Sequence, residues 1–243
     1  MDKKYWEDVA PQHKDKIFDV FVNDRKGIIQ NAIKKYAHRG QTSLDLGCAI
    51  GKWLPVLSSV SSVVYAVDIA KRYLDVAEDT HRHLSNIRYL HIDLSKPGKK
   101  IPPADMVLCV NTLLTDDEKR RDAIFHSVVS RVKRGGHLVL VVPALESALF
   151  SKIMLREWDR IDKVPVEKFD ARSKGNAYYG IIELDGTPTK HYLKEELMFL
   201  LQKAGFEVKE AAKVEYTWHT EFKNPPKWMQ SPVPWDWMVV GIR

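Results

Sequence analysis

Ser43-Leu44-Asp45-Leu46-Gly47-Cys48-Ala49-Ile50-Gly51 is the stretch that decides the fold. Short apolar residues end at Asp45, and two glycines four positions apart follow, which is typical of a buried strand that turns tightly into a helix. Such a turn lets a nucleotide-like ligand approach the backbone and the unpaired N–H groups of the helix. A second apolar run, 63–67, ends at Asp68, the place of a ribose-binding carboxylate in a βαβ mononucleotide fold. Both strand ends are expected to face one ligand.

The residues of this turn disfavour two common kinds of nucleotide ligand. A dinucleotide fingerprint requires G-x-G-x-x-G, whereas this loop reads G-x-x-x-G with Ala49 in the middle, which disfavours NAD. A P-loop requires Ser or Thr after Gly-Lys, but Trp53 follows Lys52, which disfavours ATP and GTP chemistry. A glycine-bearing turn alone also occurs in unrelated α/β loops, so the assignment depends on further motifs.

The stretch from Asp45 to Gly51 resembles the first motif of the class I S-adenosylmethionine-dependent methyltransferase family, and the resemblance covers about residues 41–243. It implies an α/β fold with a doubly wound, seven-stranded, mostly parallel sheet and helices on both faces. It also implies S-adenosylmethionine as cofactor, direct in-line transfer of its methyl group, and no metal. The implied domains are an N-terminal helical cap, 1–40, and a methyltransferase domain, 41–243.

The resemblance assigns cofactor contacts to the strand ends. Asp45 and the glycine turn would hold the methionine part, Asp68 the ribose, and Asp93 the adenine. An aromatic pair in the cap would close over the cofactor, or would instead pack as a hydrophobic staple. The full set of expected cofactor-binding residues is Tyr5, Trp6, Asp45, Gly47, Ala49, Gly51, Asp68, Ile69, Asp93, Leu94 and Asn111.

A long segment after the fifth strand, about 143–192, is expected to form a substrate lid because plain connections are far shorter. An amphipathic helix is predicted over 151–161, and Asp185-Gly186 predicts a hairpin. Aromatic residues here and in a later Pro-rich loop are candidates for an acceptor pocket, with plain packing as the alternative. These candidate substrate-binding residues are Trp158, Tyr178, Tyr179 and Trp218.

The sequence offers one weak candidate for catalysis, His191, which flanks the hairpin. A protein base is required only if the acceptor is a poorly ionised hydroxyl, so the catalytic residue stays open. Cys109 is expected to be a core residue rather than a nucleophile. Asn111 is followed by Thr-Leu-Leu, not by the Pro-Pro-aromatic pattern of enzymes that methylate nucleobase amines.

Charge and composition limit the kinds of partner and compartment that we expect. The net charge is +6, with 38 Lys and Arg against 32 Asp and Glu, but the basic residues are scattered along the chain. Two cysteines give no disulfide framework or metal spacing, and no signal or membrane segment is visible, so we expect a cytoplasmic protein. A small-molecule methyltransferase is the favoured interpretation. The alternatives are an RNA or protein methyltransferase and a non-catalytic adenosylmethionine-binding subunit, and the oligomeric state is not indicated.

Overall fold

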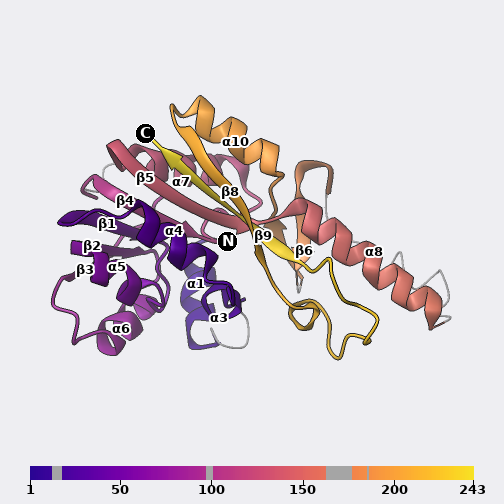
Figure 1. The fold of residues 1–243 in the computed structure, drawn as a ribbon. Coiled ribbons are helices and arrows are strands. Elements are labelled where there is room, and N and C mark those ends of the chain that lie inside the picture. The colour runs from indigo at the N-terminus through magenta and orange to yellow at the C-terminus, as the bar shows by residue number, and fades with distance from the viewer. Residues whose placement is uncertain (13–17, 97–100, 163–176, 185) are drawn as a thin grey trace.

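A computed structural model describes residues 1–12, 18–96, 101–162, 177–184 and 186–243, and its centre is a seven-stranded sheet (Figure 1). The strand order is β3-β2-β1-β4-β5-β9-β8. Strands β1 to β5 pair in parallel, and β9 runs antiparallel to both of its neighbours. The strands are β1 Gln41–Leu46, β2 Ser61–Asp68, β3 Ile87–His91, β4 Ala104–Val110, β5 Val132–Pro143, β8 Glu207–Glu215 and β9 Trp235–Ile242. The predicted doubly wound, mostly parallel sheet is confirmed.

Helices cover both faces of this sheet because its strands are apolar on both faces. Residues of β4 alternate between two core layers, with Met106 and Leu108 in one and Val107 and Cys109 in the other. The first layer includes α4 (Ile28–Tyr36), α5 (Leu54–Val60) and α6 (Lys71–Thr80). The second includes α7 (Glu118–Ser130) and α10 (Lys194–Lys203). Cys109 is therefore a fully buried core residue, as the sequence predicts.

The N-terminal forty residues divide between two places. Helix α1 (Lys3–Val9) and the short η1 (Ala10–Gln12) lie outside the two core layers, whereas α3 (Val20–Asn23) contributes Val20 to the first of them. Helix α4 instead packs on the sheet, with Ile29 and Ile33 fully buried. The predicted cap of residues 1–40 thus includes a helix that belongs to the sheet's own covering layer. Glu7 anchors α1 to the body, because its Oε1 accepts the Lys71 backbone N–H at 2.8 Å.

The segment inserted after β5 has structure of its own. Helix α8 (Leu145–Ile161) is longer than the predicted 151–161 and projects away from the sheet (Figure 1). The short η2 (Ala177–Tyr179) leads into the antiparallel pair β6 (Ile181–Leu184) and β7 (Thr187–Lys190). The predicted hairpin is therefore present, although Asp185 of its turn lies outside the described residues. The Lys190 N–H donates to the Leu114 carbonyl at 2.8 Å, which attaches β7 to the loop that follows β4.

None of the helices in the described part of the chain combines the length and apolar composition that a membrane span requires.

Candidate active site

A cavity of about 1190 Å³ opens at the carboxyl ends of β1, β2, β4 and β5. Strand β1 lies between β2 and β4, so this is the switch point of the sheet, where open α/β folds bind ligands. Residues of α1 and α3 line one side of the cavity, and residues of α8 and the β6–β7 hairpin line another. Pockets for one small ligand usually measure about 300–1,000 Å³. The cavity therefore has room for two ligands side by side.

The turn after β1 needs its glycines for two physical reasons. Gly47 and Gly51 have φ values of 81° and 79°, in the left-handed region that side chains disfavour. A Cβ atom on Gly47 would overlap the hydroxyl of Thr112, and one on Gly51 would lie 2.6 Å from Leu54 Cδ1. Gly47 and Ala49 line the cavity, whereas Gly51 does not, so Gly51 serves the packing of α5 rather than the approach of a ligand. Helix α5 begins only at Leu54, so the ligand-facing backbone is that of the turn itself.

Asp68 is held at the end of β2 by the same turn. Its Oδ2 accepts the Ala49 N–H at 2.9 Å and its Oδ1 accepts the Ala70 N–H at 2.8 Å. Burial raises the pKa of this carboxyl to about 6, although those backbone donors act against the shift. Each oxygen still has a lone pair to offer. The arrangement fits a ligand with two neighbouring hydroxyl groups, such as a ribose.

Asp45 is a buried acceptor that lacks a donor. It is 2% exposed, lines the cavity, and its Oδ2 has no hydrogen-bond partner among the described residues. Burial, and secondarily the charge of Asp68, raise its pKa to about 8. A cationic ligand beside the turn would favour the ionised form. The orphaned oxygen and the two neighbouring carboxyls therefore fit a ligand that carries positive charge.

Removing this buried carboxyl is expected to stabilise the ligand-free protein above neutral pH. The unfolded Asp45 ionises near pH 4 and the folded one near pH 8, so between these values the folded state binds more protons and loses stability as pH rises. Asp45→Asn removes the titrating group. In thermal melts, we expect the Tm of the Asp45→Asn variant to exceed the wild-type Tm at pH 8 and to approach the wild-type Tm at pH 4. A wild-type Tm that stays higher at pH 8 would contradict this.

Asp93 follows β3 and also lines the cavity, together with Leu94. Its Oδ1 accepts hydrogen bonds from the Ser95 backbone and hydroxyl and from Arg120, the last at 3.1 Å. Burial acts to raise the pKa of Asp93, but Ser95 and Arg120 together lower it. All of these donors reach one oxygen. Oδ2 is left for a donor on a ligand.

The structure brings most of the predicted cofactor residues to one cavity. Tyr5 and Trp6 of α1 line it with their rings in edge-to-face contact at 5.0 Å, and Ile69 and Asn111 line it as well. Of the predicted set, Gly51 is the member that stays outside the lining.

His191 also lines the cavity. Its Nδ1 lies 3.0 Å from the Thr189 carbonyl. A carbonyl only accepts, so Nδ1 carries the proton and Nε2 holds a lone pair. Burial lowers the pKa of His191 to about 4, which keeps the ring neutral at neutral pH. Whether it acts in catalysis stays a prediction.

The four aromatic residues predicted to bind the substrate do not line the cavity. Tyr178 and Tyr179 are 92% and 68% exposed, because η2 directs them to the surface before β6 begins. Trp218 is buried and stacks on Phe222 with ring centroids 5.6 Å apart. Trp158 contacts the same Phe222 edge-on. Of this aromatic group, Phe222 is the member that reaches the cavity.

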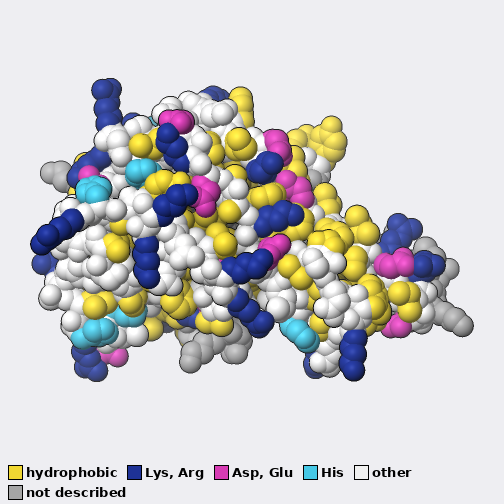
Figure 2. Space-filling model, in the orientation of Figure 1, with side chains coloured by type: hydrophobic (Ala, Val, Ile, Leu, Met, Phe, Trp, Pro, Cys, Tyr) yellow, Lys and Arg dark blue, Asp and Glu magenta, His cyan; other side chains and the backbone are white. Residues whose placement is uncertain are grey.

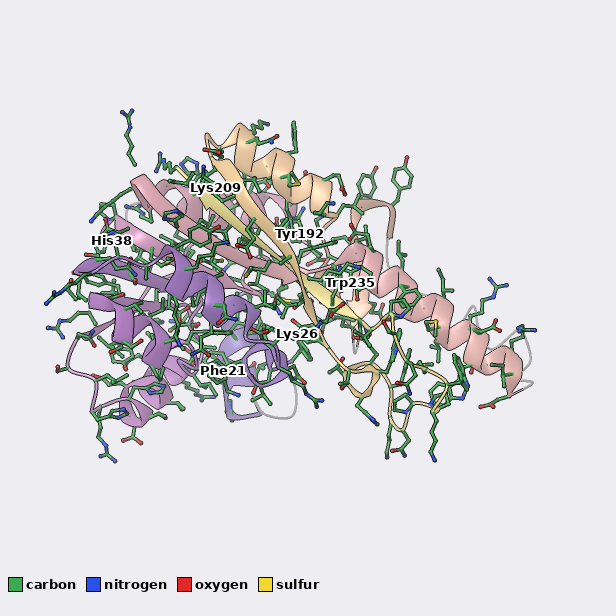
Figure 3. All side chains as sticks on the ribbon, viewed as in Figure 1. Phe21, Lys26, His38, Tyr192, Lys209 and Trp235 are labelled. Carbon is green, nitrogen blue, oxygen red and sulfur yellow. The ribbon has the colours of Figure 1, made fainter. Side chains whose placement is uncertain are left out.

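Asp236 was not expected from the sequence, and it lines the cavity with Asn111 and with Tyr216, which belongs to the late aromatic run considered for the pocket wall. The Tyr216 hydroxyl donates to Asp236 Oδ2 at 2.9 Å, and Asn111 Nδ2 donates to the same oxygen at 3.3 Å. Trp235, which precedes Asp236, marks where β9 enters the sheet near α8 (Figure 3). A single acidic residue in the otherwise apolar run of β9 is the signal that could have found this site.

Comparison with known proteins gives one match to a family model over part of the chain. A family model described as a methyltransferase domain matches residues 44–136. No curated protein sequence matches the chain.

Solved structures share the fold at low identity. Magnesium protoporphyrin IX methyltransferase from Synechocystis PCC 6803 with bound S-adenosylhomocysteine aligns at TM-score 0.58 and 14% identity, over 99% of this chain and 86% of that one. The N-methyltransferase NodS from Bradyrhizobium japonicum WM9 aligns at 0.61 and 13%, over 97% of both chains. The 1,6-didemethyltoxoflavin-N1-methyltransferase of Burkholderia thailandensis aligns at 0.65 and 12%, over 98% of this chain and 85% of that one.

Proposed function

We propose that this chain is a class I S-adenosylmethionine-dependent methyltransferase and that it transfers a methyl group to a small organic molecule, which binds beneath α8 and the β6–β7 hairpin. The observation that carries the proposal is the cavity. It runs from the carboxylates at the ends of β1, β2 and β3 to the inserted segment, and its volume of about 1190 Å³ accommodates a cofactor and an acceptor.

The carboxylates support a definite placement of the cofactor. Asp68 would accept the two ribose hydroxyls, and Asp93 Oδ2 would accept the adenine amino group. Asp45 and the backbone at Gly47 and Ala49 would hold the charged methionine end. The cofactor supplies an electrophilic methyl group on a sulfonium. The protein's part is to align the acceptor behind that carbon and to exclude water.

The N-terminal helix supports a closed site around these groups. Tyr5 and Trp6 line the cavity, and Glu7 ties their helix to α6. The α-amino group of Met1 also lies 3.4 Å from Thr115 Oγ1, on the loop after β4. Helix α1 would therefore cover the adenosine part of the cofactor.

The surface charge favours a small acceptor over a nucleic acid. Lys and Arg side chains are spread over the face shown in Figure 2 and do not form one continuous basic patch there. A nucleic acid interface would require such a clustered footprint. Neighbours of the same fold include enzymes named for a porphyrin and for a toxoflavin precursor, which are small molecules.

The acceptor class can be tested with labelled cofactor. We expect the purified protein to transfer the labelled methyl group to the low-molecular-weight fraction of a cell extract. Purified RNA should bind weakly and release as salt rises, because scattered lysines give only nonspecific phosphate contacts. Methylation of RNA at physiological salt, with none of the small-molecule fraction, would contradict the proposal.

A further inference from the structure

We infer that the methyl acceptor is an amine, which binds in its protonated form against Asp236 and gives a proton to that carboxylate before its nitrogen is methylated. The inference rests on the proposed function and names the substrate class of the same cavity. It starts from Asp236, which is absent from the expected cofactor set and lies at the other side of Asn111.

Asp236 is a buried carboxylate without a cation. It is 7% exposed, and its hydrogen-bond partners among the described residues, Tyr216 and Asn111, are both neutral. None of the ion pairs formed between described side chains includes it. A buried carboxylate in this state costs folding free energy that a bound cation would recover. Its location in a cavity indicates that the cation comes from a ligand.

The oxygens that Asp236 and Asn111 leave for a ligand are hydrogen-bond acceptors. Both donors reach Oδ2, so neither occupies Oδ1. Asn111 must turn its NH₂ toward the carboxylate, because the reverse orientation would set two acceptors against each other. Its Oδ1 is then buried with no hydrogen-bond partner among the described residues. A protonated amine offers two or three N–H donors, whereas a hydroxyl or thiol offers one.

Asp236 and Asn111 lie at the edge of the sheet where the nitrogen that receives the methyl group is expected. Asn111 follows β4, whose carboxyl end lies beside that of β1 and the glycine turn. Asp236 is paired with Pro143 in the β5–β9 register, so it lies at the same edge of the sheet. The Asn111 side chain thus connects Asp236 to the loop after β4, so a nitrogen bound to Asp236 would lie close to that loop.

The charges of the cavity also oppose an anionic acceptor. Lys52 and Arg120 are paired with Asp19 and Asp93. Glu221 and Glu183 line the cavity together with Asp236, and Lys152 is a basic residue of the same lining. A carboxylate or phosphonate would bring a further negative charge to this group. Phe18 and Tyr216, whose rings meet edge-to-face at 4.6 Å, add an aromatic wall that suits an alkylammonium group.

With an amine acceptor, the proposed reaction balances in protons and electrons. The ammonium nitrogen gives one proton to Asp236, and its lone pair then forms the new N–CH₃ bond. The C–S bond breaks with its electron pair staying on sulfur, which becomes a neutral thioether. Burial raises the pKa of Asp236 to about 6 and would lower that of a desolvated amine, so both shifts favour the transfer. The proton on Asp236 leaves to water after the product departs.

The test uses matched probes on the full chain saturated with S-adenosylhomocysteine. Benzylamine, benzyl alcohol, benzyl mercaptan and benzoate present four head groups on one ring, and saturation-transfer NMR ranks their binding. We expect benzylamine to bind at least ~10-fold more tightly than the others, since hydrogen bonds to charged groups are the strong ones. Equal binding, preferred binding of another probe, or binding of none would overturn the inference.

Asp236→Asn supplies the matched variant. It should weaken benzylamine binding about 10–100-fold and leave the other probes unchanged. Glu207→Gln, an exposed carboxylate at the opposite end of the sheet, is the control for loss of charge. The affinities for S-adenosylmethionine and S-adenosylhomocysteine should both stay at wild-type values in Asp236→Asn. A selective loss of S-adenosylmethionine would mean that Asp236 faces the sulfonium, which overturns the inference.

Different results would contradict the proposed function and the amine assignment. Absence of S-adenosylhomocysteine binding in the wild type would defeat the proposed function. Normal binding of that product together with any of the contrary probe results defeats the amine assignment alone.

Discussion

Gly47→Ala is expected to weaken the binding of S-adenosylhomocysteine by at least ~100-fold and to lower the Tm by about 5–10 °C. The backbone φ of 81° disfavours any side chain by roughly 1–2 kcal/mol. The added Cβ would also overlap the hydroxyl of Thr112, which donates to the Leu46 carbonyl at 2.9 Å. The turn must shift to relieve the overlap, and the backbone at Ala49 shifts with it. Isothermal calorimetry and thermal melts measure the two effects.

Two controls separate the backbone effect from the overlap. Gly135 has a φ of 76°, and no atom lies within 4 Å of an added Cβ. Gly135→Ala should therefore lower the Tm and leave the affinity for S-adenosylhomocysteine unchanged. Thr112→Ala removes the hydroxyl that the added Cβ would overlap. The double variant Gly47→Ala/Thr112→Ala should therefore bind S-adenosylhomocysteine more tightly than Gly47→Ala does. If Gly47→Ala binds the product as tightly as the wild type, the turn does not contact the cofactor.

Asp68→Ala is expected to weaken the binding of S-adenosylhomocysteine by about 10–150-fold. Charge-assisted hydrogen bonds to the ribose contribute roughly 1.5–3 kcal/mol, and their loss gives that range. The variant also leaves the Ala49 and Ala70 N–H groups without their acceptor, so the turn loses its support. Calorimetric titration of the variant measures the change in affinity.

Asp75→Ala is the matched control for Asp68→Ala, because it removes an exposed carboxylate of α6 that pairs with Lys71. Its affinity for the product should equal that of the wild type. An unchanged affinity in Asp68→Ala would remove the ribose contact from the account and leave Asp68 as a support of the turn.

The fold and the meeting of the strand-end carboxyls at one cavity were predictable because their signals are local. Asp45 and Asp68 lie at the carboxyl ends of β1 and β2, and Asp93 follows β3; parallel strands place such residues at one edge of the sheet. The physical role given to Gly51 was not predictable. The sequence shows that the residue is glycine, but only the fold shows that Leu54, Ala77 and His81 crowd it.

The cluster of Asp236 with Asn111 and Tyr216 could not be predicted because its signals are not local. Asp236 meets Asn111 across 125 positions of sequence, through a β5–β9 register that no turn or spacing specifies. The aromatic residues failed as markers for a related reason. Aromatic composition predicts burial in general, but Tyr178 and Tyr179 lie in a short connection whose direction the packing of β6 decides, and they face solvent.

Helix α4 shows the same distinction within the N-terminal region. The spacing of its apolar residues correctly predicts a helix. The face of the sheet that the helix covers depends on its contacts with β5 and β8. Asp24 helps to begin it from three residues before the N-cap, because its carboxylate accepts the Ile28 and Ile29 N–H groups at 2.8 and 2.9 Å.

Titration of the wild-type protein in a calorimeter tests the central claim most directly. S-adenosylmethionine and S-adenosylhomocysteine should each bind at one site per chain with micromolar affinity, because three carboxylates and an open turn converge on one cavity. NADH should give no heat of binding, since the turn lacks the dinucleotide spacing. Binding of NADH with none of either adenosyl ligand would contradict the account.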